Sequence, residues 1–252
     1  MITKIKITFD PTDKVLPRPI LAPLFQGALM DLVPEGFAEM MHVSMLRPYS
    51  QFVTSDGDSV VWTVTALDEY AQKFIIDTLS DSDFKSVTLT HKDATLKVRK
   101  KEISHISYSE LLDKYYIRRE SNRYITLKFI TPTAFKSNGK YIIMPDSSLI
   151  LNNLVRKYDS VAKTTQLYDE TLIEYINSHT EIIEYNLRSC KYAMEGITIP
   201  SFTGTAKIKL GGNHEFICLC NMLLDFAGYS GIGIKSAMGM GACGIINTGG
   251  AI

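Results

Sequence analysis

The sequence is organised around Gly228 to Gly244, which reads GYSGIGIKSAMGMGACG. Six of its seventeen residues are glycine, which reaches positive φ and lets another backbone approach closely. A solvated linker of this kind would not carry apolar side chains such as Ile232 and Met240 between its glycines. The pattern therefore predicts a packed loop that presents Lys235, Ser236 and several backbone N–H groups to anionic oxygens.

Two familiar phosphate-binding motifs do not fit this loop. A dinucleotide fingerprint needs a glycine three residues after Gly233, and that position holds Ser236. A nucleoside triphosphate loop needs Gly-Lys-Ser in sequence, whereas Ile234 separates Gly233 from Lys235. Any recognition of phosphate by this loop must therefore follow a different pattern.

The composition is that of a globular protein with one large or two small domains. The chain has 252 residues, of which 45% are hydrophobic and 21% charged. No apolar run approaches the length of a bilayer span, and the first residues are not those of a secretory signal. The four cysteines show no CxxC spacing. We therefore expect a cytoplasmic protein with no membrane partner, no metal site and no cofactor.

The charge is balanced over the whole chain but not along it. The formal net charge is zero, which argues against a protein that coats nucleic acid without specificity. Between positions 95 and 130, however, nine basic residues face four acidic ones. A segment this basic suggests an anionic partner, and on charge alone RNA contact and a solvated charged face are equal alternatives. Its basic residues include Lys97, Arg99, Lys100, Arg118 and Arg123.

Hydrophobic periodicity predicts the same order of elements in both halves of the chain. In the first half it predicts strands and helices at 3–9, 20–33, 60–65, 68–79, 87–90 and 95–103. A helix at 109–117 links the halves, and further elements follow at 124–130, 146–155, 167–178, 183–192, 203–210, 213–226 and 242–246. This order predicts an α+β protein of two tandem ferredoxin-like (βαββαβ) domains, 1–118 and 119–252, with a cleft between them.

Residues 226–241 resemble the C-terminal signature of the CRISPR repeat-processing endoribonucleases, which are members of the RAMP superfamily. In that signature a hydrophobic helix runs into Tyr-Ser-Gly-Val-Gly, followed by a basic residue, a small hydroxylated residue and Gly-x-Gly. The segments Thr131-Pro132-Thr133 and Pro145-Asp146 are similar to two further motifs of the family. The resemblance is strongest over 124–246 and weaker, though in order, over the first hundred residues.

The resemblance implies cleavage of CRISPR repeat RNA without a metal ion. The upstream 2′-hydroxyl would attack the scissile phosphate and leave a 2′,3′-cyclic phosphate and a 5′-hydroxyl. Other CRISPR effector subunits are further implied partners, and a monomer and a homodimer are both compatible with the sequence. The resemblance also places the RNA along the cleft and over the glycine loop, where the implied contacts are Gly231, Gly233, Lys235, Ser236, Gly239 and Gly241. Lys97, Arg99, Lys100, Arg118 or Arg123 would neutralise its phosphates.

A histidine early in the chain matches the place of the family's general acid or base. His42 follows a hydrophobic residue and precedes a basic–Pro–aromatic–Ser stretch, as in the family. Arg47 is the expected electrostatic partner of the phosphate, since a guanidinium holds phosphate bidentately. Some relatives have a tyrosine near the position of Met30, which cannot donate a proton. Tyr49 or Ser44 could take that role, and the sequence does not decide between them.

Three functions are compatible with these observations. The first is a metal-independent endoribonuclease that matures CRISPR transcripts, and the presence of both His42 and Arg47 favours it. The second is a catalytically inactive relative that holds guide RNA in an effector complex. The third is a ferredoxin-like protein that binds a small molecule and no RNA. The near-neutral isoelectric point favours this third function, and the glycine signature weighs against it.

Overall fold

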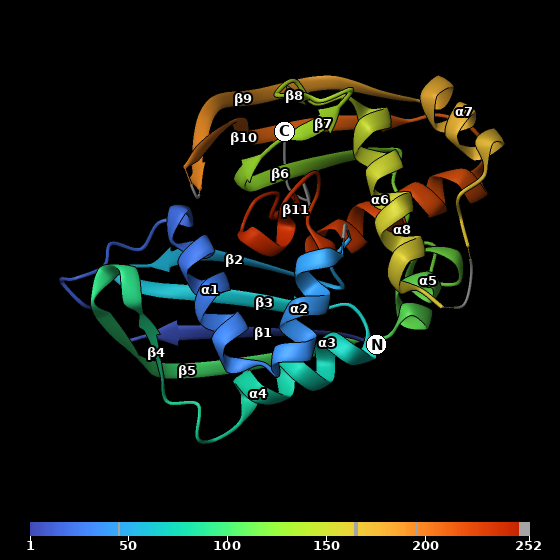
Figure 1. The fold of residues 1–252 in the computed structure, drawn as a ribbon. Coiled ribbons are helices and arrows are strands. Elements are labelled where there is room, and N and C mark those ends of the chain that lie inside the picture. Colours follow the sequence, from blue (N-terminus) through green and yellow to red (C-terminus); the bar gives the residue numbers. More distant parts are fainter. Residues whose placement is uncertain (45, 164–165, 195, 247–252) are drawn as a thin grey trace. The chain divides into compact units, whose positions relative to one another are not determined.

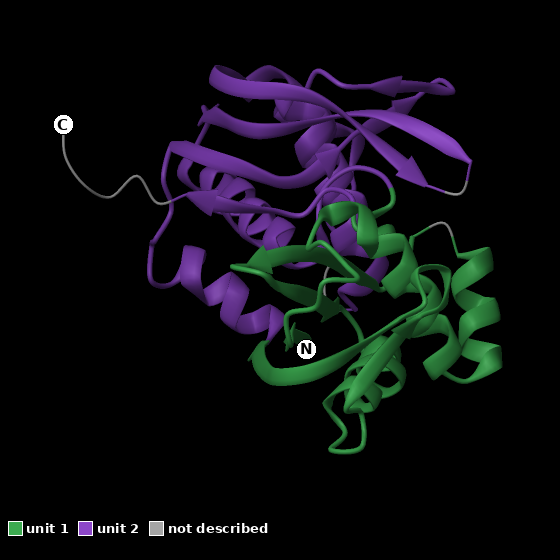
Figure 2. Ribbon diagram, turned by 90° about the vertical axis from the view of Figure 1, so that its left-hand side faces the viewer, with its two compact units in different colours: residues 1–106, 235–239 green, residues 107–234, 240–252 purple. Residues whose placement is uncertain are grey.

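The computed structural model describes residues 1–44, 46–163, 166–194 and 196–246. The chain divides into two compact units (Figure 2). Unit 1 comprises Met1–Ile106 together with Lys235–Gly239, and unit 2 comprises Ser107–Ile234 together with the chain from Met240 onward. The division after Ile106 differs from the predicted boundary at 118/119, because the linking helix belongs to unit 2. The tip of the glycine loop, in contrast, belongs to unit 1.

Unit 1 is an antiparallel sheet with helices on one face (Figure 1). Its strands pair in the order β2-β3-β1-β5-β4, so the first four have the ferredoxin-like order and β4 extends the edge. The elements are β1 (Ile2–Phe9), α1 (Ala22–Leu32), α2 (Glu35–Val43), β2 (Tyr49–Asp56), β3 (Ser59–Ala66), α3 (Glu69–Ala71), a π-helical turn (Gln72–Ile76), α4 (Asp77–Ser80), β4 (Ser86–Leu89) and β5 (Ala94–Ile106).

The core of unit 1 lies between this sheet and its helices. Ile5 and Ile7 of β1 are fully buried, and they belong to the same cluster as Phe25 and Leu29 of α1. The indole of Trp62 in β3 packs against Phe25 with 4.9 Å between the ring centroids. Burial of side chains of this size contributes about 2 kcal/mol each, so this cluster carries much of the stability of unit 1.

The helix α2 was not predicted. Pro34 and Gly36 favoured an end to the preceding helix and no new one, whereas the chain turns at Pro34 and begins a second helix at Glu35. Pro34 occupies the N-cap position with φ −56° and ψ 140°, where its missing N–H is no loss. Phe37 and Met41 are four residues apart on this helix and are both buried in the core. This burial offsets the low helix propensity of Gly36.

Unit 2 repeats the ferredoxin-like topology, so the predicted tandem fold is confirmed. Its sheet has the order β11-β6-β10-β9, and β7 and β8 form a separate hairpin. The elements are α5 (Tyr108–Tyr116), β6 (Tyr124–Thr133), β7 (Phe135–Ser137), β8 (Lys140–Ile142), α6 (Ser147–Val161), α7 (Glu170–His179), β9 (Thr180–Met194), β10 (Ile197–Leu210), α8 (His214–Ser230) and β11 (Cys243–Ile246).

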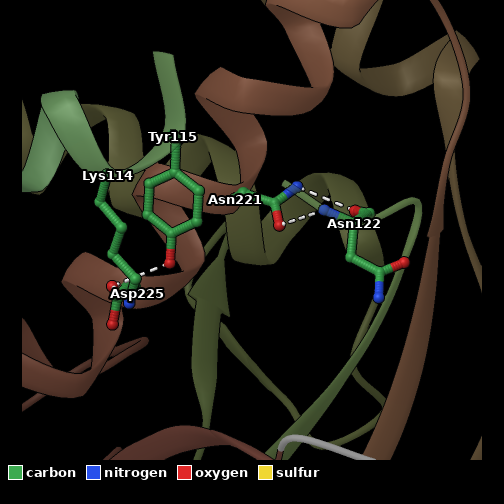
Figure 3. Close-up of polar contacts among 5 residues, drawn as sticks. All are labelled: Lys114, Tyr115, Asn122, Asn221 and Asp225. Carbon is green, nitrogen blue, oxygen red and sulfur yellow. Dashed lines mark hydrogen bonds and ion pairs between the residues drawn. The ribbon is translucent and has the colours of Figure 1, made fainter. Parts of the chain in front are cut away.

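Two polar side chains of α8 fasten that helix to α5 and to the segment after α5 (Figure 3). The Asp225 carboxylate accepts hydrogen bonds from the Lys114 ammonium and the Tyr115 hydroxyl, both at 2.8 Å. The side chain of Asn221 bonds both the N–H and the carbonyl of Asn122, each at 2.9 Å. Since α8 leads directly into the glycine loop, these contacts fix the element from which that loop starts.

No helix among the described residues combines the length and the apolar character that crossing a membrane requires.

Candidate active site and RNA interface

His42 lies in the last turn of α2, and its side chain is exposed. The carbonyl groups at this helix end are bonded by the residues that follow. The hydroxyl and the N–H of Ser44 both donate to the carbonyl of Met40, at 2.8 Å and 3.1 Å. Arg47 Nε donates to the carbonyl of Met41 at 2.8 Å. These bonds satisfy carbonyls that a helix end leaves open, so the imidazole projects from a fixed turn.

Arg47 therefore has a structural contact that the sequence did not indicate. Its side chain is half-buried, and its Nε bonds the residue directly before His42. The guanidinium also lies close enough to Tyr49 for its charge to act on the phenol. A cation at the C-terminal end of a helix is stabilised by the helix dipole. The contact with Met41 brings the guanidinium to the same helix end as the imidazole.

Tyr49 lies in a different environment from the one that a catalytic role requires. Its side chain is 0% exposed, and its hydroxyl donates to Oε1 of Gln26 at 2.9 Å. Burial raises the pKa of this phenol, although the Arg47 charge and the bond to Gln26 act in the opposite direction. A buried phenol that is already bonded cannot protonate a leaving oxygen at the surface. This bond joins the first residue of β2 to Gln26 of α1.

The glycine loop is held by hydrogen bonds that the sequence did not predict. Its backbone N–H groups were expected to face anions, but many of them donate within the protein, and five of these bonds, at 2.8–3.0 Å, hold the two ends of the loop. The bonds run from Ile232 N to Gly241 O, Gly233 N to Asn153 Oδ1, Ile234 N to Ala134 O, Gly241 N to Pro132 O, and Ala242 N to Thr131 Oγ1. These five groups serve the loop's own structure and are not available to a phosphate.

The backbone conformation of the loop requires glycine at several positions. Gly231, Gly233, Gly239 and Gly241 all have positive φ, at 66°, 75°, 93° and 73°, and all four are buried. A Cβ at Gly233 would meet the carbonyl of Ala134, so the close approach at this position also excludes larger residues. These glycines shape the loop and present little surface to a ligand.

The tip of the loop carries the polar side chains that RNA could reach. Lys235 is exposed and adopts the left-handed conformation, with φ 56° and ψ 37°. A short 3-10 turn, Ser236–Met238, follows it, and the side chain of Ser236 is half-exposed. A lysine in this conformation is uncommon, so the surrounding contacts must hold it there.

The predicted basic contacts belong to both units. Lys97, Arg99 and Lys100 are exposed on β5 of unit 1, where Lys100 forms an ion pair of 2.9 Å with Glu102. Arg118 and Arg123 are exposed in unit 2, in the segment that follows α5. Arg123 Nη1 donates to the carbonyl of Leu210 at 3.4 Å. An exposed ion pair is weak, so Lys100 remains able to exchange its partner for a phosphate.

The sequence analysis does not predict the buried position of Lys157 in α6. Its side chain is only 6% exposed, and its ammonium donates to the carbonyls of Ser230 and Gly231, at 3.2 Å and 2.9 Å. Burial lowers its pKa to about 8, although Cys243 acts in the opposite direction. The sequence carried a signal, because a lysine lies on the otherwise apolar stripe of α6.

Among the residues that the structure describes, no three or more His, Cys, Asp or Glu side chains gather closely enough to hold a metal ion.

Comparison with known proteins identifies the family. Residues 127–243 match the family model of the CRISPR-associated endoribonuclease Cas6. The chain is 30% identical over 239 residues to a CRISPR-associated endoribonuclease Cas6 of Streptococcus thermophilus, covering 94% of this chain and 96% of that protein. It is 29% identical over 223 residues to a Cas6 of Mycobacterium tuberculosis strain CDC 1551, covering 88% and 70%.

A solved structure supports the fold. The Cas6 (TTHB231) product complex has a TM-score of 0.81 with this chain at 21% identity, covering 98% of this chain and 100% of that one. The resemblance in structure extends over both units, and the resemblance in sequence to the Streptococcus protein spans nearly the whole of both chains. The chain belongs to the family of CRISPR-associated endoribonucleases named Cas6.

Proposed function

We propose that this chain cuts CRISPR repeat RNA to guide RNAs, with His42 as general acid or base. In this reaction the 2′-hydroxyl upstream of the scissile bond attacks the phosphorus, and the bond to the 5′-oxygen of the next nucleotide breaks. The 2′-oxygen loses its proton and the leaving oxygen gains one, so the products are a 2′,3′-cyclic phosphate and a 5′-hydroxyl. No metal ion is needed if a side chain moves these protons.

The observation that carries the proposal is the fixed, exposed helix end bearing His42 beside Arg47. The carbonyls of Met40 and Met41 are bonded, so the imidazole starts from a fixed backbone. A catalytic group held in this way loses little freedom when the substrate binds. Arg47 bonds Met41 through Nε and also contacts the Tyr49 phenol, and its positive charge is the one that we assign to the phosphate. Tyr49 supports this arrangement from within the core.

In this proposal exposed cationic side chains bind the RNA, and the buried glycines only shape the loop. Lys235 and Ser236 at the loop tip contact phosphate, and Lys97, Arg99 and Lys100 on β5 neutralise more of the strand. Arg118 and Arg123 of unit 2 add further positive charge. The partner that we propose is repeat RNA, and two solved structures similar to this chain are a Cas6 product complex and a Cas6 substrate-mimic complex.

The decisive experiment replaces His42 by alanine and follows cleavage of repeat RNA in single turnover, with protein in saturating excess. Loss of general acid–base help should lower the rate by about two to four orders of magnitude. Affinity for the RNA should change little, because phosphate neutralisation rests on lysine and arginine. His91→Ala is the matched control, since His91 is exposed in the turn between β4 and β5.

Two results would overturn the assignment. If His42→Ala cuts at the wild-type rate, the proton donor or acceptor lies elsewhere in the chain. If the wild-type protein binds repeat RNA without cutting it, the chain holds guide RNA and does not process it.

A further inference from the structure

Gln51 of β2 is a buried amide with all of its groups engaged. Its side chain is 1% exposed. Nε2 donates to the carbonyl of Ala22 at 2.8 Å and to that of Ala237 at 3.1 Å. Oε1 accepts from the indole Nε1 of Trp62 at 2.7 Å. One side chain of unit 1 thus joins three segments that are far apart in sequence.

The orientation of this amide is unambiguous. An indole N–H can only donate, so the amide oxygen must face Trp62. The amide nitrogen must then face the two carbonyls, and it has two hydrogens for two acceptors. Methionine at this position would leave the Trp62 indole and the carbonyls of Ala22 and Ala237 without their hydrogen bonds to residue 51. Glutamate would place a carboxylate against the two carbonyl oxygens. Only glutamine satisfies this arrangement at its present length.

One of the two carbonyls belongs to the tip of the glycine loop. Ala237 is the middle residue of the 3-10 turn that directly follows Lys235, and its side chain is buried in the core of unit 1. Within the tip, the N–H of Met238 donates to the carbonyl of Lys235 at 2.9 Å. The bond from Gln51 therefore fixes the turn that keeps Lys235 in its left-handed conformation. The other carbonyl, that of Ala22, opens α1.

We propose that Gln51 is a positioning residue for RNA binding, which holds the loop tip so that Lys235 meets the phosphate. Gln51 lies four residues after Arg47, on the strand that directly follows the proposed active-site segment, so this part of the chain also positions the lysine that we propose binds RNA. Gln51 itself is buried and touches no RNA. The inference rests on the proposed contact between Lys235 and RNA.

The test is a double-mutant cycle on RNA affinity. The probe is the repeat RNA of the same genome with a 2′-deoxy nucleotide at the scissile position, which binds without being cut. Lys235→Ala should weaken binding about tenfold, the value of one charge-assisted contact. Gln51→Met should weaken it about three- to tenfold in the wild-type background, and less than twofold when Lys235 is already alanine. A general loss of stability would act equally in both backgrounds.

Each outcome of the cycle is informative. An equal effect of Gln51→Met in both backgrounds, or no effect on a folded variant, overturns the positioning role while the proposed function stands. If Lys235→Ala does not change the affinity for RNA, the proposed RNA contact at the loop tip is wrong. If Gln51→Met does not fold, Trp62→Phe makes the same comparison, because it removes the donor that orients the amide and keeps an aromatic ring. Trp62→Phe should weaken binding by a smaller factor that again disappears with Lys235→Ala.

Discussion

Replacing the buried Lys157 should change how the stability of the protein depends on pH. Burial lowers the pKa of this lysine from 10.5 to about 8, which corresponds to a cost of about 3 kcal/mol for the charged form. Between these two values the unfolded chain binds more protons than the folded one. The free energy of unfolding must therefore rise with pH in this window. From the two pKa values, Lys157 should raise the free energy of unfolding by about 1 kcal/mol between pH 7 and pH 9.

Lys157→Met should abolish this rise. Near pH 7 the variant loses the bonds to Ser230 and Gly231 but is relieved of the buried charge, so its stability should be close to that of the wild type. At pH 9 the neutral amine of the wild type still has two N–H donors for the two carbonyls, so the variant should be less stable by about 1 kcal/mol more than at pH 7.

Urea unfolding followed by circular dichroism at pH 7, 8 and 9 measures the effect. The comparison of variant with wild type cancels groups common to both, such as the buried thiol of Cys220, whose pKa burial raises to a value outside this window. Arg156→Met is the matched control, because Arg156 is the neighbouring residue on the same helix and its side chain is exposed. Equal pH dependence in Lys157→Met and wild type would refute the account of a buried, weakly basic ammonium.

Three further results are expected. Cleavage should survive EDTA and leave a 2′,3′-cyclic phosphate, which end-group analysis of the product would show; a 3′-hydroxyl product or chelator-sensitive cutting contradicts the mechanism. Replacing Lys97, Arg99 and Lys100 together by alanine should reduce the slope of log affinity against log salt by about two, and an unchanged slope would place the RNA elsewhere. Gly241→Ala should lower the melting temperature, by about 4 °C or more, because a Cβ there meets the carbonyl of residue 232 at positive φ. Gly244→Ala, where a Cβ meets nothing within 4 Å, should melt close to the wild type, and equal losses in both would contradict the steric argument.

The parts of the fold that depend on local pattern were predictable from the sequence. Asp146 and Asn213 were expected to begin helices, and their side chains accept hydrogen bonds from the first turns of α6 and α8. The helix α2 was missed because Pro34 is compatible with both an end and a beginning. Burial of Phe37 and Met41, which is a matter of tertiary packing, decides between them.

The candidate site was predictable only in part. His42 and Arg47 lie in a local motif, whereas the acceptors that hold the glycine loop come from residues about a hundred positions earlier, such as Pro132 and Ala134. Spacing within the loop carries no information about them. The burial of Tyr49 could have been inferred, because Tyr49, Gln51 and Val53 alternate on a strand and all face the core.

The membership of the loop tip in unit 1 has a consequence for how the protein is made. All other residues of unit 1 precede position 107, but Lys235–Gly239 leaves the ribosome about 130 residues later. At the usual speed of synthesis this delay is about 7 to 25 s. During that time the first unit has the amide of Gln51 without its partner at Ala237, and a gap where that alanine later packs. The N-terminal unit is thus completed only when nearly all of the second has been synthesised, which makes their maturation one coupled reaction.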